Sequence, residues 1–254
     1  MEIVKLLQAE KLKLSRTPIV GIAVLAPGMA ALLVGSVYAF SSQDKLAEVT
    51  WATFTSGILQ LWSLIILPLY ASTLSALYIN IEHEAHMWKL LFTQPVRRSS
   101  LLLAKLCVML CLVMVSFVVL CGSLIAVAGL LHALHGIMPI FQHAAFGDTA
   151  RLLAQAYVAS IGMVVLQIMF AVQSRSIAGP IIIGVAGFML ASFARGHSLL
   201  EHITPWSYPS GVYFASIKDI SSHASIPFLM GASLTIALVS ALYIMFMLVR
   251  RDIK

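Results

Sequence analysis

Six long stretches of the chain hold almost no formal charge, and this pattern constrains the fold more than any other feature. Five of them contain no Asp, Glu, Lys or Arg, and the third contains only Asp148: 17–43, 49–81, 106–150, 152–174, 176–194 and 220–249. A helix needs about 20 predominantly apolar residues to cross a bilayer. We therefore predict an all-α, polytopic membrane protein with six transmembrane helices, organised as a single domain over residues 1–254.

Composition and residue pattern exclude the two other ways of folding such a chain. Hydrophobic residues make up 60% of the sequence and charged residues 10%, with a mean hydropathy of +0.97, whereas a soluble domain is roughly a quarter charged. A transmembrane β-barrel would alternate apolar and polar residues in segments of about ten. Stretches such as VMLCLVMVSFVVLC are apolar throughout, which indicates helices in lipid.

The expected spans follow from these stretches. They are 18–40, 56–79, 101–131, 152–172, 177–194 and 227–249. The run 106–150 is long enough for two spans, but the His, Gly and Pro residues of 132–147 suit a surface loop better than a membrane core. We therefore expect one span there. The connector 195–226 carries Pro205, Trp206 and Pro209, and we expect it to form a re-entrant or interfacial cap on the outer side.

The basic residues orient the chain in the membrane. With six spans, twelve Lys and Arg residues fall on the side of the two termini and four on the other side. Because basic residues accumulate on the cytoplasmic side, both termini are predicted to be cytoplasmic. Splitting the run 106–150 would change the count only to eleven against five, so the charges alone do not decide the number of spans.

Residues 1–16 are predicted to form an interfacial helix. Ile3, Val4, Leu7 and Leu14 fall on one helical face, with basic residues opposite. Such a helix rests on a membrane surface with its apolar face down. The alternative is a frayed basic tail.

A compact charged and aromatic segment joins the second and third expected spans. We predict a cytoplasmic helix over 82–93, ended by Pro95, whose preceding residue is disfavoured in helical geometry. Aromatic anchors surrounded by charge are typical of protein interfaces, so we expect a partner to dock here. The alternative is an amphipathic turn resting on lipid. The docking residues would be Glu82, His83, Glu84, Met87, Trp88, Lys89, Leu91 and Phe92.

The sequence holds no energy source of its own. No G-x-x-x-x-G-K-[ST] motif is present, so the chain lacks that phosphate-binding loop. No acidic or basic residue lies deep within an expected span, whereas ion-coupled carriers keep ionisable groups there. A transporter of this kind must draw its energy from another subunit. We expect no cofactor in this chain, with ATP and Mg²⁺ held by that partner.

Three amides lie at membrane depth: Gln60, Asn80 and Gln167. They are candidates for lining a transport pathway, and interhelical hydrogen bonding is the alternative. We predict no metal site, because the histidine pairs 83/86 and 132/135 suit surface positions and the EHEAH segment lacks the H-E-x-x-H spacing of metalloproteases. An intramembrane enzyme is therefore a remote alternative.

The order of these features resembles the permease subunits of ABC exporters of the second export type. The resemblance rests on an interfacial helix, six spans, and the spacing of Glu82, Trp88, Lys89, Leu91, Pro95, Arg98 and Lys105. The segment ITPWSYP, which contains Pro205, Trp206 and Pro209, is similar to the Pro-Trp-x-x-Pro of the branch that protects bacteria against lantibiotics.

This resemblance implies a concrete assembly. Two permeases, identical or sister subunits, would share a bacterial cytoplasmic membrane with two cytoplasmic ATP-binding subunits; lipid would be a further partner and nucleic acid would not. Residues 82–93 would be the coupling helix and residues 1–16 the elbow helix. The cargo would be an amphipathic peptide of the lantibiotic or bacteriocin type, or another hydrophobic compound. A permease for cofactor export, in haem or copper-enzyme maturation, is the alternative.

Overall fold

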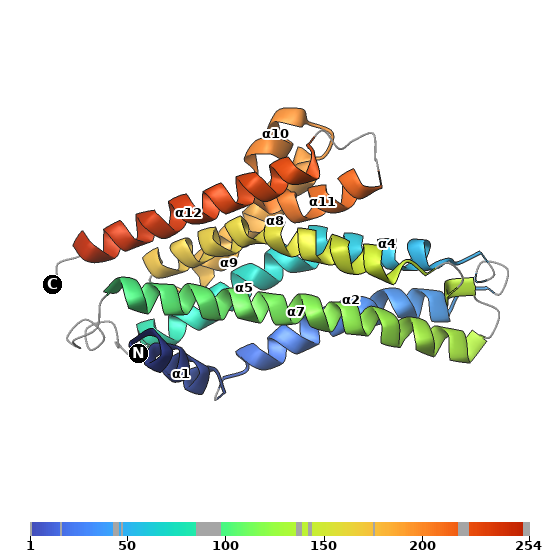
Figure 1. Cartoon of the computed structure of the whole chain (residues 1–254), viewed down its shortest axis with the longest axis horizontal. Helices are drawn as coiled ribbons and strands as arrows, with labels where there is room; N and C mark the ends of the chain where they lie inside the picture. Colours follow the sequence, from blue (N-terminus) through green and yellow to red (C-terminus); the bar gives the residue numbers. More distant parts are fainter. Residues whose placement is uncertain are drawn as a thin grey trace.

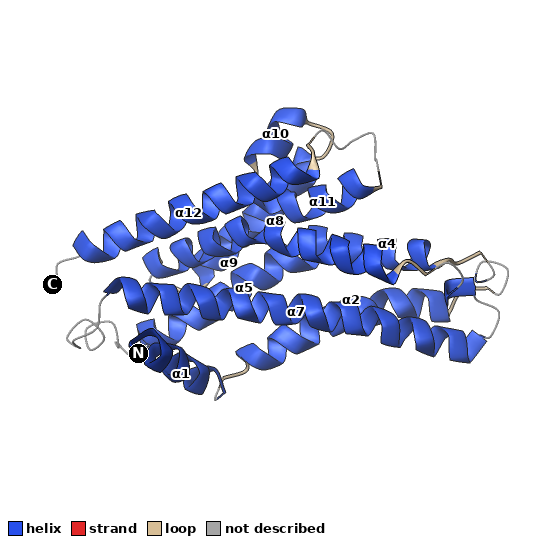
Figure 2. Ribbon diagram, viewed as in Figure 1, coloured by secondary structure: helices blue, strands red, loops and turns tan. Residues whose placement is uncertain are grey.

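The computed structural model describes residues 2–15, 17–42, 46, 48–84, 98–135, 139–141, 144–174, 176–217 and 224–250. Every regular element among them is helical, and no strand occurs in these ranges (Figures 1 and 2). The α-helices are α1 (Glu2–Ser15), α2 (Ile19–Ala39), α4 (Trp51–Leu61), α5 (Leu67–Glu84), α7 (Arg98–His135), α8 (Phe146–Gln173), α9 (Ala178–Ala194), α10 (Ser198–Ile203), α11 (Tyr208–Ser216) and α12 (Ile226–Arg250). The other elements are the π turn η1 (Trp62–Ile66) and the 3₁₀ turns η2 (Pro139–Phe141) and η3 (Pro205–Ser207).

The long helices lie side by side and alternate in direction, so α1 and the end of α12 lie at the same end of the bundle (Figure 1). α7 packs against α2 and α8; α8 also packs against α12 and α5, and α5 packs against α9. α1 lies across the base of this bundle against the start of α7. The arrangement therefore places α1, the end of α5 and the start of α7 together.

Five helical segments are long and apolar enough to cross a membrane: Ile19–Ala39, Trp51–Glu82, Ser99–His135, Phe146–Gln173 and Ile226–Met247. The all-helical fold is confirmed for the described residues, with these five helices as candidate spans. The remaining expected span, 177–194, corresponds to α9, which has 17 residues and is about 26 Å long at 1.5 Å per residue. This length is at the lower limit for a spanning helix, so the six-span topology stays a prediction.

The stretch that was long enough for two spans contains one continuous helix. α7 runs unbroken to His135, one turn beyond the predicted end at 131, and α8 begins only at Phe146. α7 is about 57 Å long at 1.5 Å per residue, more than the hydrocarbon core of about 30 Å. Its surplus length carries the helix past the apolar layer rather than back through it.

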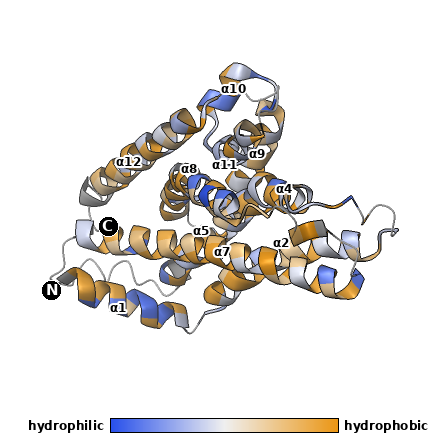
Figure 3. Cartoon of the chain, turned by 45° about the vertical axis from the view of Figure 1, so that its right-hand side comes forward, coloured by the Kyte–Doolittle hydropathy of each residue, from blue (hydrophilic) through white to orange (hydrophobic). Residues whose placement is uncertain are grey.

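The outer faces of the bundle are apolar, as lipid requires. Large side chains such as Leu25 on α2 and Leu238 on α12 are exposed along these helices, and Figure 3 shows both helices mainly in the hydrophobic colour, with hydrophilic patches on α1 and α10. In water such faces would be a liability. In a bilayer they need no cover, because hydrocarbon is their solvent.

The second span is interrupted by the π turn η1. The span begins at Trp51, earlier than predicted. The Thr50 side chain accepts a hydrogen bond from the backbone N–H of Thr53 at 3.3 Å and so caps the helix there. Within η1, the buried Trp62 ring packs edge-on against Phe117 of α7, with ring centroids 5.9 Å apart. A π turn changes the rotation of the helix that follows about its axis. The spacing of buried positions along α4 is therefore not continued in register along α5.

The connector after α9 is folded into the bundle. It forms α10, η3 and α11, and α11 packs against α8 and α12. Trp206 and Pro209, expected to cap the outer side, are buried, while Pro205 is half-buried. The Trp206 ring fits over Gly187 of α9, where a Cβ would overlap the indole. Close packing against α9 thus fixes the connector.

This contact gives a first testable expectation. Gly187→Ala should lower the stability of the folded chain by about 1–3 kcal/mol, because overpacking forces the indole out of place. Gly122→Ala is the matched control, since a Cβ there meets no atom within 4 Å. Thermal unfolding in detergent, followed by tryptophan fluorescence, measures both. Equal melting temperatures for the two variants would contradict the packing of Trp206 on α9.

Candidate functional site

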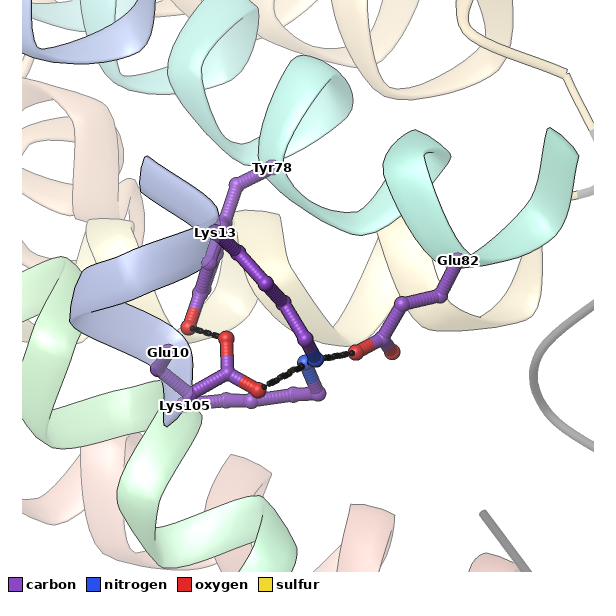
Figure 4. A network of polar contacts seen from close by, with 5 residues as sticks. All are labelled: Glu10, Lys13, Tyr78, Glu82 and Lys105. Carbon is purple, nitrogen blue, oxygen red and sulfur yellow. Dashed lines mark hydrogen bonds and ion pairs between the residues drawn. The ribbon is translucent and has the colours of Figure 1, made fainter. Parts of the chain in front are cut away.

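Four charged side chains meet where α1, α5 and α7 come together at the end of the bundle that holds both termini (Figure 4). They are Glu10 and Lys13 of α1, Glu82 of α5 and Lys105 of α7. Because each Lys contacts both carboxylates, the charges alternate around a closed ring. We call these four residues the charge square.

The contacts of the charge square are short. Lys13 Nζ lies 2.9 Å from Glu10 Oε1 and 3.0 Å from Glu82 Oε1. Lys105 Nζ lies 3.1 Å from Glu10 Oε1 and forms a close ion pair with Glu82 Oε1. The Tyr78 hydroxyl donates to Glu10 Oε2 at 2.7 Å, and Lys105 Nζ lies 5.1 Å from the centre of the Tyr78 ring. Three helices are therefore joined by charge-assisted hydrogen bonds.

Burial makes these ion pairs important for the stability of the fold. The side chains of Glu82 and Lys105 are each 1% exposed, that of Glu10 is 3% exposed, and that of Lys13 is 24% exposed. A buried ion is costly unless its partners remain in place. The square carries two positive and two negative charges, so removing any single residue leaves a net charge in it.

The pKa values of the two α1 residues follow from this setting. Burial raises the pKa of Glu10, but the charge of Lys105 and the hydrogen bonds from Lys13 and Tyr78 outweigh burial and hold the pKa below its ordinary 4.5. Burial lowers the pKa of Lys13, but the charge of Glu82 and the contacts with Glu10 outweigh it and raise the pKa above 10.5. Both groups therefore stay charged over a wide pH range.

A pH dependence follows. The lowered pKa of Glu10 means that its contribution to stability is present above pH 4.5 and is lost as the pH falls through the folded-state value. The raised pKa of Lys13 means that its contribution is present below pH 10.5 and is lost at higher pH. We expect the difference in melting temperature between wild type and Glu10→Gln to be constant near neutral pH and to shrink below about pH 4. A difference that persists in acid would contradict this assignment.

Three of the eight predicted docking residues belong to the described part of the structure, and five do not. Glu82 points inward into the charge square rather than onto an exposed face. His83 and Glu84 belong to the last turn of α5. Met87, Trp88, Lys89, Leu91 and Phe92 lie outside the described residues, so their docking role stays a prediction.

The expected apolar face of α1 is divided. Ile3 and Val4 are exposed and Leu7 is half-buried, whereas Leu14 belongs to the hydrophobic core. Lys13 is one of the basic residues placed by the sequence on the outward polar face, but it turns toward α5 instead. Its ion partner on that helix, Glu82, is far away in sequence and accounts for this orientation.

The three amides are not brought together. Gln60 is exposed on α4, and Asn80 is half-buried near the end of α5. Gln167 is fully buried on α8, where its amide satisfies two neighbours: Oε1 accepts from Trp206 Nε1 at 3.1 Å and Nε2 donates to the Pro180 carbonyl at 3.3 Å. For Gln167, the structure therefore favours the alternative role given to these amides, which is hydrogen bonding between helices.

Sequence reasoning missed the role of Glu10, Lys13 and Tyr78. One signal was present: Glu10 is an acidic residue inside an otherwise basic segment from Lys5 to Lys13, where it needs a cationic neighbour. Lys105 was named only as part of the spacing that resembles the permease family, without a partner. No group of three or more metal-ligating side chains occurs among the residues described above.

Comparison with known proteins assigns the chain to a family. Residues 6–191, well over half of the chain, match the family model described as ABC-2 family transporter protein. The match extends from α1 into α9 and so contains all four residues of the charge square. No curated protein and no solved structure matches the chain. The chain therefore belongs to the ABC-2 family of transporter membrane proteins.

Proposed function

We propose that this chain is the permease subunit of an ATP-driven exporter, with residues 82–93 docking onto a separate ATP-binding subunit. The family implies a partner that binds ATP. The observation that carries the proposal is the charge square, because it contains Glu82 at the start of the proposed docking segment and Lys105 on the helix that follows the segment. The square thereby ties α5, which leads into the segment, to α7, which leads out of it.

The membrane unit would be a pair of permeases, either two copies of this chain or one copy with a sister subunit, above two ATP-binding subunits. Both termini and the docking segment would face the cytoplasm in a bacterial cytoplasmic membrane. The end of α12 lies at the same end of the bundle as α1 and the start of α7, which supports placing both termini and the docking segment on one side of the membrane (Figure 1). The ATP and Mg²⁺ would be bound by the partner.

The cargo we propose is an amphipathic peptide of the lantibiotic or bacteriocin type, or another hydrophobic compound taken from the membrane. In the described parts of the membrane-spanning helices, the buried charged side chains are Glu82 and Lys105, at the helix ends. Buried polar groups further along these helices are hydroxyls and Gln167. A pathway between such helices favours an apolar or weakly polar cargo over an ion.

ATP hydrolysis tests the two-subunit proposal. The chain would be expressed in its native host with an affinity tag and purified with whatever ATP-binding subunit stays attached. We expect the complex to hydrolyse ATP and the chain stripped of its partner to show only background hydrolysis. Robust turnover by the isolated chain, or the absence of any ATP-binding partner from the native complex, would refute the proposed function.

A further inference from the structure

α4, the first part of the second span, carries polar side chains on its outward side. Thr53 and Gln60 are exposed, and Ser56 between them is half-buried. Residues three and four positions apart share one face of a helix, so these three form a continuous polar strip. We call Thr53, Ser56 and Gln60 the α4 polar face. The buried residues on the opposite side of the helix are mainly apolar or aromatic: Trp51, Phe54, Thr55, Ile58 and Leu59.

Gln60 is the residue of this face that needs a partner. The Ser56 hydroxyl donates to the Thr53 carbonyl at 2.7 Å, and the Thr53 hydroxyl lies 3.0 Å from that of Thr50. The side-chain amide of Gln60 makes no hydrogen bond to any described residue. Gln60 follows Trp51, where the span begins, by nine residues, or about 14 Å along the helix axis. An unpaired amide at that depth is costly in hydrocarbon.

The exposed sides of other spans have a different chemistry. Large aliphatic side chains such as Leu25 and Leu32 on α2, and Leu234 and Leu238 on α12, are exposed along these helices. Such side chains are as apolar as lipid tails and need no further partner in a bilayer. The amide of Gln60 cannot be satisfied in that way. The contrast indicates that α4 faces something other than lipid.

We propose that the α4 polar face packs against the same face of a second copy of this chain. The proposal rests on the proposed function, which calls for two permeases, and it selects two identical copies over a sister subunit. In a two-fold contact, residues near the axis meet their own counterparts. The α4 polar face carries no formal charge, so identical copies do not repel each other there. A carboxamide is both donor and acceptor, so two Gln60 side chains satisfy one another, and the small Ser56 lets the helices approach closely.

Disulfide cross-linking in membranes of the native host tests this contact. In a background lacking the three native cysteines, Ser56→Cys and Gln60→Cys are made one at a time and oxidised with copper phenanthroline. Leu25→Cys and Leu238→Cys are the matched controls, because both side chains are exposed on other spans. We expect at least one α4 variant to give a dimer of this chain in at least tenfold higher yield than either control. Equal yields at α4 and at the controls, or no dimer at either α4 position, would overturn the proposal.

Further measurements separate a second copy from the other occupants of this face. Ser56→Cys/Gln60→Leu should give at least threefold less dimer than Ser56→Cys, and an unchanged yield would overturn the pairing of the amides. Modification of Gln60→Cys by a membrane-impermeant thiol reagent, without any dimer, would assign the face to a water-filled cargo path and overturn the proposal. A cross-linked product that contains a different permease would do the same. Failure of any ATP-binding subunit to co-purify with the wild-type chain would instead refute the proposed function, whatever the cross-linking result.

Discussion

Lys105→Ala should destabilise the folded chain by about 3–5 kcal/mol, the cost of removing one partner from a buried ion pair. The substitution leaves the carboxylates of Glu10 and Glu82 with Lys13 as their only cation in the charge square. Glu82 is most affected, since its Oε2 already has no hydrogen-bond partner among the described residues. Equilibrium unfolding in mixed detergent micelles measures the change in the free energy of unfolding.

Two controls separate this effect from a general loss of charge. Lys11→Ala on the exposed side of α1 should change the free energy of unfolding by less than about 0.5 kcal/mol, as surface substitutions do. Glu82→Met/Lys105→Met should cost less than Lys105→Ala, because it removes both charges of one pair and leaves Glu10 paired with Lys13. Equal effects of Lys105→Ala and Lys11→Ala would show that the square contributes nothing to stability.

The spans could be predicted well because one local property determines them. The first was expected at 18–40 and is observed at Ile19–Ala39, and the last was expected at 227–249 and is observed at Ile226–Arg250. Hydrocarbon excludes charge, so the charged residues that flank each stretch mark its limits. The second span was predicted less well at its start, where the cap at Thr50 adds a helical turn.

The charge square could not be predicted in the same way, because its residues are far apart in sequence. Glu10 and Lys105 are separated by 95 positions, and Lys13 and Glu82 by 69. A helical wheel of α1 places Lys13 with the outward polar residues, since the wheel contains no information about which neighbour lies beside each face. Only the packing of α1 on α7, next to the end of α5, reverses that orientation.

Membrane depth and exposure are likewise different properties. Gln60 and Gln167 were both recognised as amides at membrane depth, but one is exposed and the other is fully buried against Trp206. The rotation of each helix decides which case applies. In the second span, the π turn at Trp62–Ile66 alters that rotation midway, and no apolar periodicity in the sequence reveals it.

Trp88→Glu and Leu91→Glu should each abolish stable co-purification of the ATP-binding subunit. Central aromatic and apolar anchors of an interface cost at least about 2 kcal/mol when truncated, which is roughly a 30-fold loss of affinity. A buried carboxylate adds a desolvation penalty to that loss. Pull-down from the native host, with the amount of ATP-binding subunit measured per tagged chain, gives the result.

The matched control is Phe40→Glu, which also replaces an apolar side chain with a carboxylate. It lies at the end of the first span that is farther from α1. Phe40 is 92% exposed and follows α2 at the end of the bundle away from both termini. Because a cytoplasmic partner would not reach it, this variant should co-purify the ATP-binding subunit as wild type does. If Phe40→Glu loses the partner while Trp88→Glu keeps it, the proposed docking segment and the orientation of the chain are both wrong. If all three variants keep it, only the docking segment is wrong, and the partner must bind elsewhere on the chain.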